Sequence, residues 1–268
     1  MNLSHESLSP DEIQRAISTG RLGKKIHYFG TIPSTNLKAQ ALAKQGAADG
    51  EIVIAEEQTH GKGRMGRGWV SPPYLNLYLS VILRPKISPT LAPQFTLMSA
   101  VAIADTVQSI LSFPPEIKWP NDILVDRKKI AGVLTESSCE PDRILFVIIG
   151  IGINLNFSRE MMPESIQEKA TSVLILTQRP VDRNAFTCRL IQSLDQCYGE
   201  LENGGFASIM QRWDSYFRLR GKNVTVEMPD RRVSGRVEGI DTDGALILMG
   251  EGGGRERIVA GDVIPIDY

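Results

Sequence analysis

Short apolar runs separated by helical patterns predict a mixed α/β domain over most of the chain. The expected strands cover residues 25–29, 52–55, 75–83, 116–118, 123–125, 130–136 and 144–155. Helices are expected from Pro10 to Gly20, from 34 to 46, over 91–112, from Asp182 to about 203 and over 206–219, with caps at Ser9 and Asp182. The polar turn 126–128 between two strand patterns predicts a hairpin.

The pattern changes after Gly221. Short β-rich runs at 223–228, 232–240, 245–249 and 256–266 are separated by turn residues such as Asp243–Gly244 and a run of three glycines. This spacing predicts a small five-strand barrel. We therefore divide the chain into an N-terminal helix and linker at 1–24, a main domain at 25–220 and a small domain at 221–268.

Composition and charge describe an ordinary globular protein. The chain has 268 residues, 42% apolar and 23% charged, which is enough for a hydrophobic core without disulfides. A formal net charge of -1 argues against a protein held on nucleic acid or an anionic membrane by overall positive charge. No apolar run suits a signal peptide or a membrane helix, so we expect a cytoplasmic protein.

The three cysteines, an odd number without C-x-x-C spacing, indicate a reducing compartment and no structural zinc. Cys188 and Cys197 fall within a helical pattern and are expected to be small core residues, with a catalytic thiol as the alternative.

The stretch 58-QTHGKGRMGRGW-69 fits the letters G-x-G-x-x-G but lacks the context of a dinucleotide-binding turn. Its first glycine comes six residues after Ala55, the pair Pro72–Pro73 prevents a helix after the last glycine, and Lys86 stands where an acidic residue is needed. No Gly-Lys pair is followed by Ser or Thr, so the Walker pattern is also missing.

What remains is a loop of four glycines and three cations, Lys62, Arg64 and Arg67. Glycines let backbone N–H groups approach an anion, and the cations supply counter-charge. The alternative is a solvated basic loop without a ligand.

Four other stretches accompany this loop: 34-STN-36, 118-KWPND-122, 129-KIAGVLTE-136 and 150-GIGIN-154. In this order the five motifs closely resemble those of the biotin-protein ligases, over residues 25 to 268. The resemblance implies a mixed sheet with flanking helices, like that of class II aminoacyl-tRNA synthetases, and an SH3-like C-terminal barrel. It also implies that 25–220 is the catalytic domain, which binds biotin and ATP.

The resemblance implies that ATP activates biotin to biotinyl-5'-AMP, and that biotin then passes to a lysine of a carrier domain such as that of acetyl-CoA carboxylase. Two anions that repel each other must meet in such a reaction, so fixed cations are required. By resemblance, Lys129 bridges the carboxylate and the phosphate, and Arg64 is the second catalytic cation. The alternative for Lys129 is an exposed position in the hairpin.

The resemblance also implies the substrate-binding residues. Biotin's neutral ureido ring needs a few oriented polar groups, and a glycine lets the ring lie against backbone. The implied biotin-binding residues are Ser34, Thr35, Asn36, Gln58, Gly61, Lys62, Gly63, Arg64, Lys129 and Gly132. One of these, Ser34 or Thr35, is also expected to cap the following helix. The family more often has arginine in place of Lys62, and some members have another cation in place of Met65.

The implied ATP-binding residues are Arg67, Trp69, Asn121, Asp122, Lys129 and Asn154. Trp69 is expected to stack on adenine, with a core tryptophan as the alternative, whereas Trp119 and Pro120 are expected to be structural. Asp122 is the expected contact for Mg²⁺, which takes one or two carboxylates together with phosphate oxygens.

Two other functions are weighed. A lipoate or octanoate transferase needs a long apolar tunnel, which the polar residues Ser34, Thr35, Asn36 and Gln58 argue against. A biotin-sensing DNA repressor needs a winged helix-turn-helix, and the single helix expected before residue 30 is too short for one. We expect no nucleic-acid or membrane partner. A homodimer formed through the sheet is left open, as is the role of the small barrel.

Overall fold

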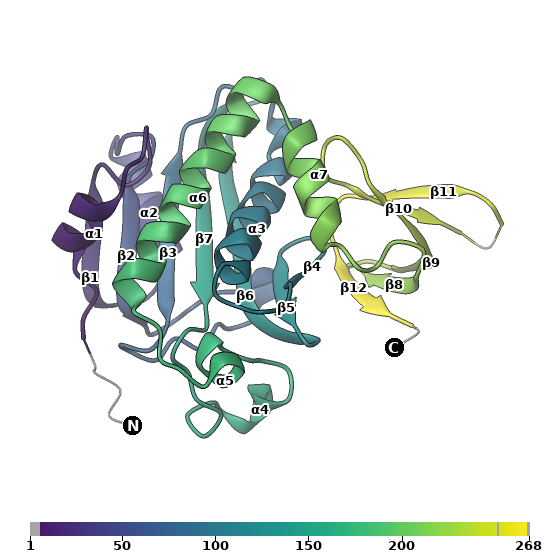
Figure 1. Ribbon diagram of the computed structural model, residues 1–268. Coiled ribbons are helices and arrows are strands. Elements are labelled where there is room, and N and C mark those ends of the chain that lie inside the picture. The colour runs from purple at the N-terminus through teal and green to yellow at the C-terminus, as the bar shows by residue number, and fades with distance from the viewer. Residues whose placement is uncertain (1–5, 251, 267–268) are drawn as a thin grey trace.

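The computed structural model describes residues 6–250 and 252–266, which form two sheets and the helices around them (Figure 1). The larger, seven-stranded sheet has the order β1-β2-β3-β7-β6-β5-β4, with β1 and β2 parallel and all other neighbours antiparallel. Its strands are β1 (Ile26–Ile32), β2 (Ile52–Gln58), β3 (Leu77–Leu83), β4 (Glu116–Lys118), β5 (Asp122–Val125), β6 (Lys128–Cys139) and β7 (Ile144–Ile153). The predicted mixed α/β fold is confirmed.

Helices lie on both faces of this sheet, and its central strands β2, β3 and β7 are accordingly buried on both sides. The α-helices are α1 (Pro10–Ala16), α2 (Thr35–Lys44), α3 (Pro93–Gln108), α4 (Glu164–Gln167), α5 (Val173–Thr177), α6 (Arg183–Gly204) and α7 (Ala207–Tyr216). Short 3₁₀ turns occur at η1 (Arg64–Gly66) and η2 (Pro89–Leu91). None of the described helices has the length and hydrophobicity needed to cross a membrane.

Successive side chains of a strand point to opposite faces of the sheet, so alternate residues pack against different helices. Ile149 and Ile151 of β7 belong to the large core with α3 and α6. On the other face, Phe146 and Ile148 pack in the smaller core that includes Ala39 of α2. The next two residues on that face of β7 are glycines, so the apolar packing against α2 stops there.

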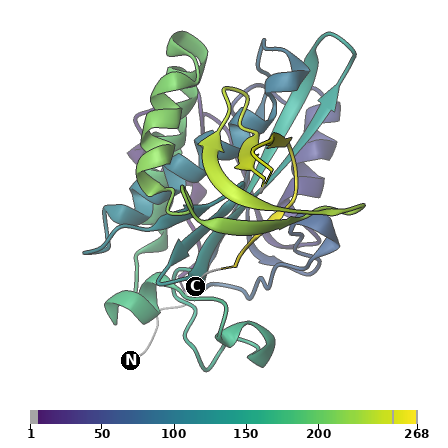
Figure 2. The ribbon, with the colours of Figure 1, turned by 90° about the vertical axis from the view of Figure 1, so that its right-hand side faces the viewer.

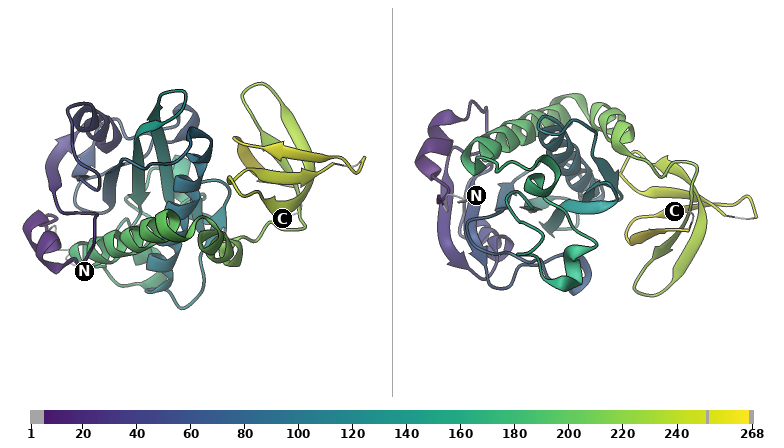
Figure 3. Two further views of the ribbon diagram at one scale, coloured as in Figure 1. Left: turned by 90° about the horizontal axis from the view of Figure 1, so that it is seen from above. Right: turned by 60° about the horizontal axis from the view of Figure 1, so that its bottom comes forward.

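The smaller sheet is antiparallel, with the order β11-β10-β9-β8-β12. Its strands are β8 (Asn223–Glu227), β9 (Arg232–Ile240), β10 (Leu246–Met249), β11 (Arg255–Ile258) and β12 (Asp262–Pro265). The sheet lies at one side of the molecule, beyond α7, and Figure 2 looks onto it (Figures 2 and 3). Trp119 joins the two parts: it is 2% exposed, and its Nε1 donates a 3.0 Å hydrogen bond to the carbonyl of Gly244.

Two predicted helix starts are confirmed, whereas one predicted helix end is wrong. The hydroxyl of Ser9 accepts from the N–H of Glu12, and the carboxylate of Asp182 accepts from the N–H of Ala185. The first helix ends at Ala16 instead of Gly20, because the carboxylate of Asp195 on α6 binds the N–H groups of residues 20 to 22. A tertiary contact there replaces the last helical turn.

Candidate functional site

Most of the predicted site residues surround one pocket. The floor of this pocket is a strip of glycines in the middle of the seven-stranded sheet. In register across four strands, Tyr78 of β3 faces Gly152 of β7, which faces Gly132 of β6, which faces Asp122 of β5. Without Cβ atoms, the two glycines leave a flat backbone surface that a planar group can approach closely.

Polar side chains of α2 and β2 form one end of this pocket. The side chain of Ser34 makes no capping hydrogen bond, so the predicted capping role is wrong for this residue. Instead, the amide oxygen of Gln58 accepts from the N–H of Thr35 at 2.8 Å and lies 3.1 Å from its hydroxyl. The Gln58 amide nitrogen donates to Ser71. A residue of β2 therefore satisfies the start of α2, and the hydroxyl of Ser34 is left for a ligand.

Asn36 is held in one orientation by three neighbours. Its amide nitrogen donates to the Glu136 carboxylate at 2.7 Å and to the carbonyl of Leu134 at 3.2 Å. Its amide oxygen lies 2.7 Å from the hydroxyl of Ser80. Reversing the amide would place its oxygen against two acceptors, so only this orientation is satisfied. A Cβ on Gly150 would lie 2.1 Å from the same oxygen, so this glycine provides the space that Asn36 occupies.

The glycine-rich loop, residues 61–69, folds back on itself over the pocket. Trp69 N–H donates to the carbonyl of Gly61 at 2.9 Å, and Gly63 N–H donates to that of Arg67 at 2.7 Å. The turn between them contains Met65 and Gly66 at φ 54° and 74°, a left-handed conformation that favours glycine at the second position. With this hairpin-like course, Lys62 extends toward Ser34 and Thr35, whereas Arg64 and Arg67 extend toward the other end of the pocket.

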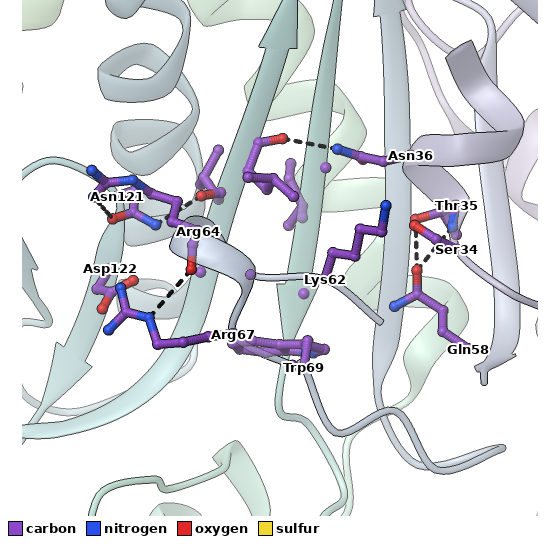
Figure 4. Close-up of a pocket in the computed structure, with 18 of the residues that line it drawn as sticks. Ser34, Thr35, Asn36, Gln58, Lys62, Arg64, Arg67, Trp69, Asn121 and Asp122 are labelled. Atoms are coloured by element: carbon purple, nitrogen blue, oxygen red, sulfur yellow. Dashed lines mark hydrogen bonds between the residues drawn. The ribbon is translucent and has the colours of Figure 1, made fainter. Parts of the chain in front are cut away.

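Figure 4 shows Ser34, Thr35, Asn36 and Gln58 at one end of the pocket and Arg64, Asn121 and Asp122 at the other. Lys62 and Trp69 lie between the two groups, and the ammonium group of Lys62 extends toward the first. Neutral hydrogen-bonding groups therefore line one end of the pocket, with Lys62 as the cation nearest to them, and the other end is ionic.

Arg64 is the most enclosed loop cation. Its guanidinium donates to the side-chain oxygen of Asn121 at 2.9 Å and to the carbonyl of Gly261 at 3.1 Å. Burial lowers the pKa of Arg64, while the carboxylates of Asp262 and Asp122 act in the opposite direction. Arg67 is more exposed and lies 2.5 Å from the carboxylate of Asp262. Both guanidinium groups therefore contact Asp262 at the ionic end of the pocket.

Lys129 points into the pocket from the start of β6. Its backbone is fixed by hydrogen bonds with residues 169 and 171, and its ammonium nitrogen lies 2.7 Å from Asp122 Oδ1. The angles at this oxygen do not meet the geometry of a hydrogen bond, so the contact between Lys129 and Asp122 is an ion pair. The ammonium nitrogen also lies 5.2 Å from the centre of the Trp69 ring, within cation–π range.

Trp69 lies flat on the glycine strip. A Cβ on Gly152 would be 2.5 Å from the indole ring, and one on Gly132 would be 3.2 Å from it. The ring is only partly buried, so Trp69 is not a core tryptophan. Its indole N–H is buried without a hydrogen-bond partner. A buried donor without a partner is costly, and an acceptor on a bound ligand would relieve that cost.

The structure brings together thirteen of the predicted site residues around one pocket. They are Ser34, Thr35, Asn36, Gln58, Lys62, Gly63, Arg64, Arg67, Trp69, Asn121, Asp122, Lys129 and Gly132. Gly61 does not line the pocket, because it supports the loop: a Cβ there would lie 2.4 Å from the carbonyl of Trp69. Asn154 is also outside, with its amide nitrogen bonded to the carbonyl of Thr171.

Several residues of the site were not predicted from the sequence. Gly68, Gly150 and Gly152 line the pocket, and the hydrogen bonds of Ser80 and Glu136 hold Asn36. The two strand glycines could have been found from the sequence. Glycine at alternate positions of an otherwise apolar strand indicates that one face must accept a close neighbour.

A metal ion would find few protein ligands here. Among the residues that the structure describes, no cluster of three or more His, Cys, Asp or Glu side chains could hold one. Asp122 offers a single carboxylate beside the pocket cations. This donor set fits Mg²⁺ that takes most of its oxygens from phosphate and water, and it does not fit a site made by protein alone.

Two family models match the chain. The Biotin/lipoate A/B protein ligase family matches residues 28–154, and the Biotin protein ligase C terminal domain matches residues 220–264. The first match contains β1 to β7 except the first two residues of β1, together with every residue that lines the pocket, and the second contains the five strands of the smaller sheet except the last residue of β12.

Curated relatives match nearly the whole chain. The bifunctional ligase/repressor BirA of Bacillus spizizenii is 35% identical, over 96% of this chain and 78% of that protein. The biotin–[acetyl-CoA-carboxylase] ligase of Mycobacterium tuberculosis is 34% identical, over 92% of this chain and 91% of that protein. Among solved structures, the biotin protein ligase from Aquifex aeolicus in complex with biotin and ATP superimposes with a TM-score of 0.75. It is 25% identical and covers 91% of this chain and 100% of that one.

Proposed function

We propose where each substrate binds in this chain, which belongs to the Biotin/lipoate A/B protein ligase family. The chain is an ATP-dependent biotin–protein ligase, and relatives named biotin–[acetyl-CoA-carboxylase] ligase align with most of its length. The observation that carries the site proposal is the polarity of one pocket: mostly neutral hydrogen-bonding groups at one end, with Lys62 beside them, and Arg64, Arg67 and Lys129 at the other, joined by a glycine floor.

The neutral end suits the ureido ring of biotin. Ser34 keeps a free hydroxyl, Thr35 and Gln58 are fixed by their mutual hydrogen bonds, and Asn36 is held in one orientation. Side chains whose rotamers are already fixed lose little entropy when a ligand binds. Loop residues Gly61, Lys62 and Gly63 would cover the ring and chain of the vitamin, with Gly61 acting through the shape of the loop.

The ionic end suits the meeting of the biotin carboxylate with the α-phosphate of ATP. Lys129, Arg64 and Arg67 approach this region from two elements that are far apart in sequence, β6 and loop 61–69. Cations fixed before reaction stabilise the developing charge without reorganising. We assign Lys129 the bridging position between carboxylate and phosphate, and Arg64 the stabilisation of biotinyl-5'-AMP.

Adenine would stack on Trp69, whose indole N–H has no protein partner, and Gly132 would leave room for the indole ring and the Lys129 side chain that bound groups contact. Asn121 and Asp122 would lie at the phosphates, with Asp122 as the one carboxylate for Mg²⁺, which would neutralise phosphate charge there. Asn154 would act indirectly, since its hydrogen bond to residue 171 supports the segment that holds Lys129.

The proposal also covers the domains of the chain, its location in the cell and its partners. Residues 25–220 form the catalytic domain, related in fold to class II aminoacyl-tRNA synthetases, residues 221–268 form an SH3-like domain, and 1–24 are a helix and linker. The protein works in the cytoplasm, and its partner is the biotin carrier domain of a biotin-dependent carboxylase, without nucleic acid or membrane. A homodimer would form through the sheet, where β1 is an edge strand.

Exchange of labelled pyrophosphate into ATP tests the first half-reaction. We expect exchange that requires both biotin and Mg²⁺, and no exchange with lipoate in place of biotin, because polar side chains such as Ser34, Asn36 and Gln58 line the end that would take an apolar chain. Exchange supported by lipoate but not by biotin would refute the proposed specificity and favour the lipoate ligases of the same family.

A further inference from the structure

A carboxylate of the smaller sheet lies against the catalytic loop. Asp262 is the first residue of β12, and one of its oxygens lies 2.5 Å from Nη2 of Arg67. Its other oxygen lies 3.5 Å from Nη1 of Arg64. Two cations of one loop therefore share a single carboxylate that comes from the other part of the molecule.

The backbone before Asp262 is shaped for this contact. Gly261 has φ +154°, and a Cβ there would lie 2.5 Å from Val226 and 3.0 Å from the carbonyl of Glu227. Only glycine fits this course of the chain. The carbonyl of Gly261 accepts a hydrogen bond from Arg64 at 3.1 Å, 197 residues away in sequence. Backbone and side chain of the same turn thus contact the same guanidinium.

The surroundings make this contact stronger than an ordinary surface ion pair. The side chains of Arg64 and Asp262 are only 18% and 24% exposed, and poor solvation strengthens attraction between opposite charges. Arg67 and Arg64 repel each other, as the effect of Arg67 in lowering the pKa of Arg64 indicates. A shared carboxylate offsets this repulsion and lets both cations face the same pocket.

We propose that Asp262 is a positioning residue for biotin activation: it holds Arg64 and Arg67 together and thereby keeps loop 61–69 closed over the acyl-adenylate. Asp262 does not line the pocket, so it acts through the two arginines. The smaller sheet is then part of the closure of the active site. This inference rests on the proposed function, because the retained molecule is the product of the first half-reaction.

The test compares Asp262→Asn with Glu227→Gln in the full chain. Glu227 is the residue opposite Asp262 in β8, and its carboxylate pairs with Arg232 away from the pocket, so this variant removes the same charge from the same sheet. For Asp262→Asn we expect biotinyl-5'-AMP to escape about fivefold faster, equivalent to about 1 kcal/mol, and the KM for ATP to rise. Asp262→Glu should restore part of the retention.

Limited trypsin cleavage within the loop gives a second readout that needs no activity, and it should be faster in Asp262→Asn only. A double-mutant cycle with Arg67→Gln checks the coupling, since Arg67 is 61% exposed and its loss leaves the core intact.

Three results would each overturn the inference. The first is that adenylate escape and loop cleavage are unchanged in Asp262→Asn, and the second is that Glu227→Gln has the same effects as Asp262→Asn. The third is that the effects of Asp262→Asn and Arg67→Gln are strictly additive. A lower KM for ATP would also overturn it, because Asp262 would then compete with the triphosphate for the arginines. A wild-type protein without biotin-dependent exchange would instead refute the proposed function, whatever the cleavage result.

Discussion

Removing the charge of Lys129 should abolish most adenylate formation and leave the fold intact. At about 4 Å and an effective dielectric of about 20, one cation attracts one anion by about 4 kcal/mol, and Lys129 would face two anions. Solvent and the neighbouring arginines offset part of this attraction. Loss of a fixed group that stabilises charge in a transition state typically costs about 10²–10³ in rate. We expect Lys129→Gln to slow biotin-dependent pyrophosphate exchange by that factor.

Stability should change little in this variant. The Lys129–Asp122 pair is partly exposed, at 32% and 23%, so we expect its loss to cost no more than about 1 kcal/mol, or about 2–4 °C in Tm. Lys128→Gln is the matched control, because Lys128 precedes Lys129 on β6, is 33% exposed and pairs weakly with Glu168 at 4.0 Å. Exchange within about threefold of wild type in Lys129→Gln, or an equal loss in Lys128→Gln, would refute the reasoning.

Three further outcomes are expected. Gly150→Ala should displace Asn36 and raise the KM for biotin at least tenfold with little change in the KM for ATP, at a stability cost of about 1–3 kcal/mol; equal changes in both KM values would contradict this. Adding ATP should change tryptophan fluorescence in wild type but not in Trp69→Phe, because the other two tryptophans are buried. Burial tends to raise the pKa of Glu51, but His27, the N–H of residue 48 and Lys25 outweigh it and hold that pKa below the ordinary value. The resulting stabilisation is fully present above pH about 4.5 and is lost as pH falls through the folded-state pKa, so Glu51→Gln should flatten the acid side of a plot of unfolding free energy against pH.

Much of the fold could be predicted because its signals are local. Buried strands such as β3 and β7 are runs of apolar residues, and at the helix starts the side chains of Ser9 and Asp182 accept from backbone N–H groups only three residues further along the chain. The end of α1 could not be predicted, because the carboxylate of Asp195 that replaces the last turn comes from α6.

Site residues that belong to a sequence motif could be predicted. Contacts between residues that come together only in the folded structure could not. Lys129 and Arg64 belong to recognisable motifs, and the structure places both at one pocket. Gln58 satisfies the start of α2 in place of Ser34, a contact that depends on how β2 and α2 pack. The contact of Asp262 with the loop likewise depends on how the two sheets are arranged, so no local sequence pattern could predict this contact.

Transfer of biotin to a carrier domain tests the central claim most directly. The full chain is mixed with ATP, Mg²⁺, biotin and an unmodified biotin carrier domain of a carboxylase, and the products are probed on a blot with streptavidin. We predict one labelled carrier band that requires all four additions and is lost when the acceptor lysine of the carrier is changed to arginine. A blot without carrier labelling under these conditions, from protein that is folded, would contradict the account.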